Sequence, residues 1–277
     1  MESTRTTITN HDGLIAFFLS IPIGLLGGLI GLGGAEFRLP VLVGVLKRQV
    51  HEAVPINLSV SLITIIASIL IRLKGLSEFP FKELLPILLS MIFGAVVAAA
   101  FAAGLATRIS SRTLEGWMKF LLISIGLLLI VEGFVPFLSA DLLHNSILFQ
   151  SAVGITAGVL IGIVSSTLGV AGGELIIPTL VFIFGLGVKV AGTASLLISL
   201  PTVCSGLFRY YRSKAFFNRS SMIQIVIPMG IGSVLGSMLG GLLFIFVSST
   251  GIKVFLGIIL ICSAIRMFLN PHSAKSR

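Results

Sequence analysis

The composition of this chain of 277 residues excludes an ordinary soluble protein, because 56% of the residues are hydrophobic and only 10% are charged. Its mean hydropathy of +1.12 is far above that of a soluble domain of this size. A net charge of +9 would fit anionic partners, but in a membrane protein the placement of Lys and Arg matters more than their sum. We therefore expect an integral membrane protein that binds no nucleic acid.

Apolar runs that reach or approach the length of a spanning helix, about 20 residues, occur eight times along the chain. They lie near residues 13–33, 53–71, 84–105, 119–138, 147–170, 190–208, 221–247 and 252–269. The runs are continuous and do not alternate, which excludes a closed β-barrel and predicts an all-α fold. Cys204 and Cys262 fall inside these runs, and we expect them to be reduced thiols packed in the core.

One segment of the chain occurs twice. Shifting the sequence by 138 positions gives six identities across the thirteen residues 31–43: Gly31, Gly34, Glu36, Pro40, Leu42 and Val43 match Gly169, Gly172, Glu174, Pro178, Leu180 and Val181. So long a period indicates a duplicated unit and not a solenoid. We expect a single membrane domain over residues 1–277, with repeat one at about 13–138, repeat two at about 147–269 and a linker at 139–145.

The basic residues favour one topology over another. If residues 13–46 fold back at their glycines, and residues 147–188 do the same, the positive-inside bias is stronger than if each segment crosses once. The fold-back leaves outside only Arg72, Lys74, Lys82, Lys189 and Lys253. Both termini are then cytoplasmic, and each repeat has one hairpin and three crossing helices. That odd number of passages inverts the second repeat, an architecture that recurs in secondary transporters.

Glycines predict a break in the first helix of each repeat. Gly31, Gly33 and Gly34 lie within four residues, and glycine disfavours the interior of a helix. Backbone left unpaired at membrane depth must line a cavity or be buried in protein. A half-helix starting at residue 36 points its free amides into the break and attracts anions. The matching glycines of repeat two are Gly169, Gly172 and Gly173.

Three charged residues accompany the breaks. Glu36 and Glu174 occupy equivalent places, and each is either an electrostatic cap of its half-helix or a protonatable group that couples transport to a proton gradient. Arg38 has no counterpart, because Ile176 stands in its place. A central Arg is costly in a membrane and needs a partner. That partner is Glu36 or Glu174 in an ion pair, or a transported anion, unless Arg38 snorkels to the surface.

Polar residues recur in the next helix of each repeat. Asn57 and Ser61 share a helix face because they are four residues apart, as do Ser195 and Ser199. Such side chains either bridge to a neighbouring helix or complete a binding site beside the break. We find no Walker loop, no metal-ligand spacing and no Ser/His/Asp grouping, so we expect no enzyme, no metal site and no cofactor.

The two glycine-to-proline motifs resemble those of the TauE/SafE family of membrane anion transporters, also called sulfite exporters. They run from Gly27-Gly28-Leu29-Ile30-Gly31-Leu32-Gly33-Gly34 through Pro40, and from Gly162 through Pro178. The resemblance extends to length, hydropathy and duplication over essentially the full chain. Glycine and alanine are exchanged between the motifs at two positions, since Ala171 stands where the first has Gly33, and Ala35 where the second has Gly173. The resemblance implies transport of sulfite, thiosulfate or organosulfonates in the cytoplasmic membrane of bacteria.

The expected function is therefore secondary transport of a small sulfur-containing oxyanion by alternating access, with proton coupling as a hypothesis. An anion channel could use the same glycines and arginine, and a non-transporting subunit or sensor could use the breaks for packing alone. The expected partners are the anion, membrane lipid and, by analogy with how such transporters often assemble, a second copy of the chain in a homodimer.

Overall fold

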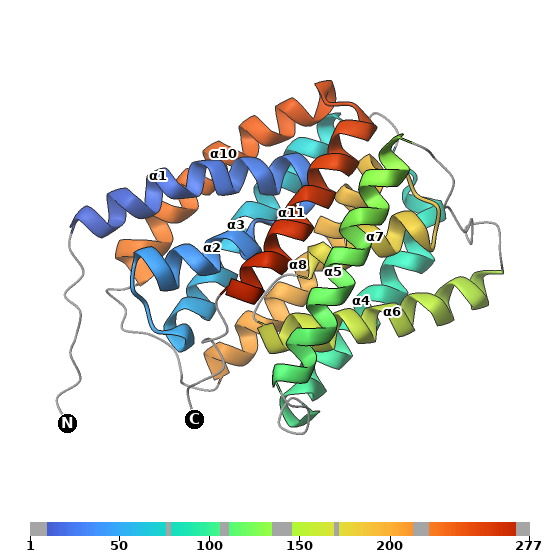
Figure 1. Ribbon diagram of the computed structural model, residues 1–277, viewed down its shortest axis with the longest axis horizontal. Coiled ribbons are helices and arrows are strands. Elements are labelled where there is room, and N and C mark those ends of the chain that lie inside the picture. Colours follow the sequence, from blue (N-terminus) through green and yellow to red (C-terminus); the bar gives the residue numbers. More distant parts are fainter. Residues whose placement is uncertain are drawn as a thin grey trace.

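The computed structural model describes residues 10–75, 79–105, 111–134, 146–168, 172–212 and 222–269, and the linker expected at 139–145 lies outside these ranges. Every regular element in the described ranges is helical (Figure 1). Within the described ranges, each of the eight apolar runs overlaps one or more helices, so the predicted all-α fold is confirmed. The reason is that long continuous apolar runs can satisfy their backbone in a membrane only as helices.

The helices of the first half of the chain are α1 (Asn10–Leu26), the π-helical segment η1 (Gly27–Gly31), α2 (Ala35–Pro40), the π-helical segment η2 (Val41–Val45), α3 (Val50–Gly75), α4 (Phe81–Leu105) and α5 (Ser111–Phe134). Those of the second half are α6 (Ile147–Leu168), α7 (Gly173–Phe182), α8 (Val188–Arg212), the π-helical segment η4 (Met222–Val226), α10 (Ile227–Phe246) and α11 (Ser249–Leu269).

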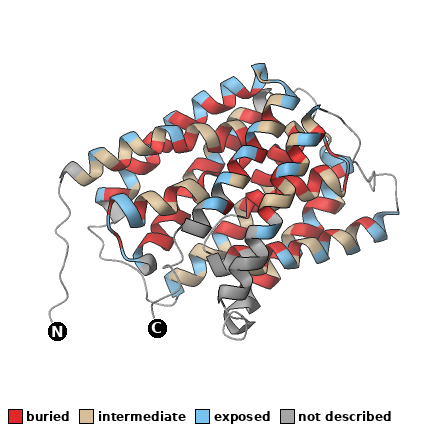
Figure 2. Cartoon of the chain, viewed as in Figure 1, coloured by how far each residue is buried: buried red, intermediate tan, exposed pale blue. Residues whose placement is uncertain are grey.

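Five stretches of the described chain are long and apolar enough to cross a membrane: Asp12–Gly31, Glu52–Leu73, Phe81–Ala99, Val188–Arg212 and Gln224–Phe246. Large apolar side chains also cover the outside of the molecule. Leu148 and Phe246 are 83% and 84% exposed, while buried residues follow the inner helix faces (Figure 2). Water would not favour such a surface, but lipid does. The chain is a multi-pass membrane protein.

Glycines let the main helix pairs approach closely, as their spacing predicts. A Cβ placed on Gly24 or Gly28 of α1 would overlap the backbone of Ser233 or Ser237 in α10. Conversely, a Cβ on Gly236 of α10 would overlap the backbone oxygen of α1 at Ile21. Glycines at the contacts of α4 with α6 and of α5 with α11 are packed as tightly. Each pair therefore depends on having no side chain where the two backbones meet.

The helix pairs join one half of the chain to the other. In duplication order, α1 corresponds to α6, α3 to α8, α4 to α10 and α5 to α11. The first of these helices in each half packs along the third of the other half, in the pairs α1–α10 and α4–α6, while α3 packs on α8 and α5 on α11. A two-fold relation produces such reciprocal contacts. The inversion of the second repeat stays a prediction.

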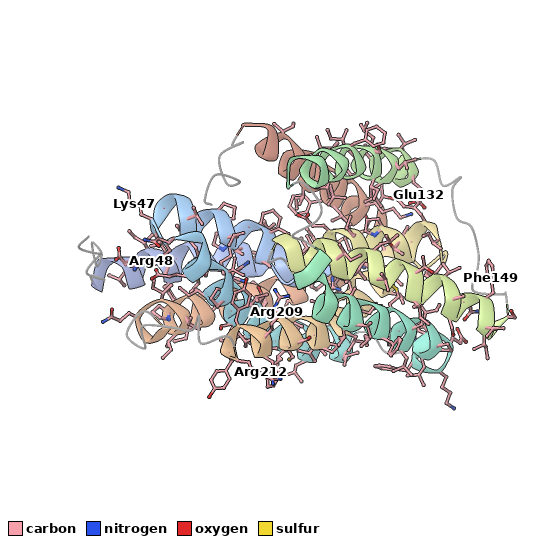
Figure 3. The ribbon with its side chains drawn as sticks, turned by 90° about the horizontal axis from the view of Figure 1, so that it is seen from below. Lys47, Arg48, Glu132, Phe149, Arg209 and Arg212 are labelled. Atoms are coloured by element: carbon pink, nitrogen blue, oxygen red, sulfur yellow. The ribbon has the colours of Figure 1, made fainter. Side chains whose placement is uncertain are left out.

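The first hairpin folds back on itself. Arg48, just after η2, forms an ion pair of 3.4 Å with Asp12 near the start of α1, so both arms end on one side. Figure 3 shows Lys47 and Arg48 at one end of the molecule, with Glu132 and Phe149 at the other. At that other end, Lys253 of α11 pairs with Glu132 of α5 at 2.7 Å.

The two cysteines correct one expectation. Cys204 and Cys262 are free thiols, as expected, but both are exposed on the outside of their helices and not packed in the core. The hydrophobicity of a residue does not show which face of a membrane helix it lies on, because the lipid-facing side is as apolar as the protein-facing side.

Candidate functional site

The first break interrupts the helix made by α1 and η1. Gly31, Gly33 and Gly34 have φ angles of 98°, 78° and 75°, a region that residues with a Cβ enter only at a cost. Chain direction reverses there, and α2 begins at Ala35. The predicted break at these glycines is confirmed. Its two arms are a long helix entering the protein and a short one, α2 with η2, leaving it.

The second break lies beside the first. Gly172 has a φ of 77° and directly precedes α7, whereas Gly169 and Ala171 lie outside the described residues. A Cβ placed on Gly173 would be 3.1 Å from the Cα of Leu32, inside the first break. The N-termini of α2 and α7 therefore meet in the protein interior, where the breaks of both repeats contact each other.

Each of these N-termini carries a carboxylate in its first turn, Glu36 in α2 and Glu174 in α7. Glu174 is 8% exposed. Their charges interact: Glu174 repels Glu36, and Arg38 attracts it. The backbone N–H of Glu36 lies near its own carboxylate, but among the described residues neither oxygen has a hydrogen-bond partner of good geometry. The electrostatic cap and the proton-coupling group both stay predictions for Glu36.

Arg38 is fully buried, so it does not snorkel to the membrane surface. Within the described part of the chain it forms no ion pair, and all of its hydrogen-bond partners are neutral. The guanidinium donates to Asn57 Oδ1 at 3.3 Å, Ser61 Oγ at 2.8 Å, Thr64 Oγ1 at 3.1 Å and Ser233 Oγ at 3.2 Å. Its Nε–H has no partner. The guanidinium therefore keeps its charge uncompensated by contact, with one donor free.

Asn57 and Ser61 meet on Arg38, as their shared helix face predicts. Asn57 also donates from Nδ2 to the carbonyl of Ala35 at 3.0 Å, which ties α3 to the first residue of α2. Sequence reasoning missed Thr64 and Ser233. Thr64 lies one further turn along the same face of α3, so the spacing could have revealed it. Ser233 comes from α10, and only the packing of α1 along α10 brings it near.

The corresponding serines of repeat two lack a cation. Ser195 and Ser199 are buried in α8, at positions equivalent to Asn57 and Ser61. Ile176 replaces Arg38 there, and Ser195 Oγ has no hydrogen-bond partner among the described residues. The structure does not bring these serines to Arg38. The site is asymmetric, because the cation and three of its side-chain acceptors belong to repeat one, while repeat two contributes only Ser233.

A second buried arginine was missed. The charge count treats Arg72 as an outer cation, but the side chain is only 1% exposed and donates to the carbonyls of Gly28 and Leu29 in η1. Its place at the end of an apolar run looks like that of a loop residue in the sequence. The role of Arg72 can be recognised only in the folded protein, because η1 lies beside the last turns of α3.

The family model described as Sulfite exporter TauE/SafE matches residues 16–267. A relative from Methanocaldococcus jannaschii, whose name is "Probable membrane transporter protein", is 34% identical over 127 residues, which cover 44% of this chain and 46% of the relative. The alignment thus spans about half the length of that protein. No solved structure matches the chain significantly. The matched segment includes both breaks and nearly all of the helices, and the chain belongs to the sulfite exporter TauE/SafE family of membrane transporters.

Proposed function

We propose that this protein is a secondary transporter that moves a small sulfur-containing oxyanion across the cytoplasmic membrane by alternating access. The observation that carries the proposal is the contact between the two broken helices, which brings two half-helix N-termini and two carboxylates together in the protein interior. Interrupted helices of two repeats that meet at one place are typical of the substrate sites of secondary transporters.

The proposed binding site for the anion is formed by the glycine turns Gly31, Gly33, Gly34, Gly172 and Gly173. Backbone N–H groups at the start of a helix have no partner within the helix, and the helix dipole adds positive potential there. Arg38 supplies a full positive charge and a free Nε–H donor. Asn57 and Ser61 orient its guanidinium, and Ser195 brings a hydroxyl without a partner from the opposite repeat.

Proton coupling follows from the two carboxylates. An oxyanion that approaches Glu36 and Glu174 is repelled when both are ionised, because all three charges are negative and water is scarce at this depth. Protonation of the carboxylates removes that repulsion. Binding of the anion and binding of a proton therefore favour each other, which couples the flux of one to the gradient of the other.

The test is flux into proteoliposomes of radiolabelled sulfite, thiosulfate and a small organosulfonate, with and without an imposed pH gradient. Wild-type protein is expected to show saturable flux that the gradient accelerates. In Glu36→Gln the acceleration is lost, because the amide is not protonated. Lys47→Gln is the matched control, since Lys47 lies at the end of the molecule and its side chain is exposed.

Two outcomes would contradict the proposal. Flux that rises linearly with concentration and shows no counterflow would identify an anion channel. Absence of flux for all three anions, from protein that is shown to be folded, would eliminate this substrate class. A non-transporting subunit or sensor would be favoured if, in addition, none of the anions raised the thermal stability of the purified protein.

A further inference from the structure

Arg72 is a buried cation whose bonds all go to neutral groups. It lies three residues before the end of α3 and is 1% exposed. Each of its three nitrogens donates a hydrogen bond: Nε to Gly28 O at 2.9 Å, Nη2 to Leu29 O at 2.7 Å and Nη1 to Thr193 Oγ1 at 3.3 Å. Since every nitrogen is engaged, a transported anion is not needed to satisfy this arginine.

Two of these bonds go to the end of the helix that precedes the first break. The last carbonyls of a helix have no partner within the helix, and Gly28 and Leu29 stand in that last turn because the chain leaves the helix after Gly31. A cation at a helix C-terminus is also favoured by the dipole. Arg72 therefore caps the long arm of the first hairpin with both charge and hydrogen bonds.

The other contacts of Arg72 reach into the second half of the chain. Thr193 belongs to α8, and the guanidinium carbon lies 4.0 Å from the ring centroid of Phe244 in α10. Gly31 and Gly192 cross beside it, and a Cβ on either glycine would be 2.8 Å from Nη1 of Arg72 and would overlap the opposite backbone. The guanidinium of Arg72 therefore packs against the point where the first break crosses α8, and neither glycine there could carry a side chain.

We propose that Arg72 is the positioning residue of the first break, and that its contacts with Gly28 and Leu29 determine where α2 presents Glu36 and Arg38. The effect on anion transport rests on the function proposed above, whereas the effect on the break does not. Arg72 acts through the backbone of η1 and does not touch the anion. Losing its cap frees the turn at Gly31 to open and misplaces the N-terminus of α2.

The test of the positioning role is amide hydrogen exchange, measured by mass spectrometry on protein in lipid nanodiscs. Arg72→Lys keeps the charge but cannot hold both carbonyls with a planar fork. We expect exchange in residues 27–40 to become about tenfold faster or more, as loss of one charge-assisted hydrogen bond implies. Exchange in α5, which packs mainly on α11, should not change.

Two further variants distinguish the bonds of Arg72 to η1 from its bond to Thr193 of α8. Thr193→Val removes the acceptor of Nη1, together with the bond that Thr193 Oγ1 donates to Lys189 O at 3.2 Å within α8, but leaves both bonds of Arg72 to η1 in place. Exchange in residues 27–40 should therefore change far less than in Arg72→Lys. Arg209→Lys is the matched control, because Arg209 donates to one carbonyl, that of Ala99 in α4, at 3.2 Å. Equal effects of Thr193→Val and Arg72→Lys would overturn the capping role. Unchanged exchange in Arg72→Lys, or acceleration in every helix alike, would overturn the positioning role.

The same variants are then assayed for sulfite flux. Arg72→Lys is expected to raise the half-saturating sulfite concentration about tenfold, while maximal flux per folded protein changes less than about threefold. Arg209→Lys should match wild type in both. An unaltered half-saturating concentration in Arg72→Lys would show that Arg72 does not influence the anion site. If wild type moves no sulfite, the proposed substrate is wrong, and hydrogen exchange alone decides the positioning role.

Discussion

Arg38 is held by neutral acceptors, so its replacement should affect anion affinity more than folding. Removing the charge takes away the cation of the proposed site but strands no ionised partner in contact with it. The hydroxyl of Thr64 already donates to Val60 O at 2.8 Å, so it stays partly satisfied without the guanidinium. Arg38→Gln should therefore weaken anion affinity by about tenfold or more while the protein stays folded.

Titration calorimetry with sulfite and a thermal unfolding curve measure the two effects of Arg38→Gln separately. Ser68→Ala is a suitable control, because Ser68 is buried on α3 and its Oγ has no hydrogen-bond partner in the described chain. Normal sulfite affinity in Arg38→Gln would remove this residue from the site.

Glu36 and Glu174 interact, so their substitutions should not be additive. If the two carboxylates respond to the proton as one unit, Glu36→Gln already abolishes the dependence of flux on a pH gradient. The double variant with Glu174→Gln should then transport no more slowly than Glu36→Gln alone. Proteoliposome flux at several imposed gradients measures this. A double variant slowed by the product of the two single effects would show that the carboxylates act independently.

At the scale of the helical element, the first break depends on Gly31 in two ways. Its φ of 98° is strained for any residue with a Cβ, and that Cβ would overlap the backbone at Gly192. Gly31→Ala should therefore destabilise the protein by about 2 kcal/mol or more. Gly44→Ala in η2 is the matched control, because nothing lies within 4 Å of the added methyl group.

Helix propensity predicts that Gly44→Ala is neutral or stabilising by up to about 1 kcal/mol. Chemical unfolding in detergent, followed by circular dichroism, compares the two variants with wild type. Equal stability of Gly31→Ala and Gly44→Ala would contradict the tight crossing of η1 with α8.

The sequence predicts those features of these elements that depend on residues close together in the chain. Glycine clusters determine backbone conformation within a few residues, so both half-helices and the first break were predictable. The face shared by Asn57 and Ser61 was equally local. Ser233 and Arg72 were not predictable, because they reach the site through pairings between distant helices. The exposed Cys204 shows a further limit, since hydrophobicity does not distinguish lipid from protein interior.

For the whole molecule, the fold-back determines on which side of the membrane each end of the structure lies. Lys47 and Phe149 lie at opposite ends (Figure 3). Single cysteines at these positions, after Cys204 and Cys262 are replaced by alanine, should react differently with a membrane-impermeant maleimide. From outside intact cells, Phe149→Cys should be labelled and Lys47→Cys should be protected, because the positive-inside rule places Lys47 in the cytoplasm. Since Arg48 pairs with Asp12, residues 13–46 return to the side on which they start, so the reverse labelling would contradict the cytoplasmic placement of Lys47 and not the fold-back.

The reciprocal pairing of helices also has a consequence for the order of synthesis. Ribosomes make α1 first, yet the glycine face of α1 packs on α10, which is made almost last. Until then, Gly24 and Gly28 face lipid or a provisional neighbour, and the first break lacks the helices that enclose it. In the same way, α4 is synthesised before α6, the helix on which it packs. Insertion of single helices can proceed along the chain, but the interior of this protein closes only when its second half has entered the membrane.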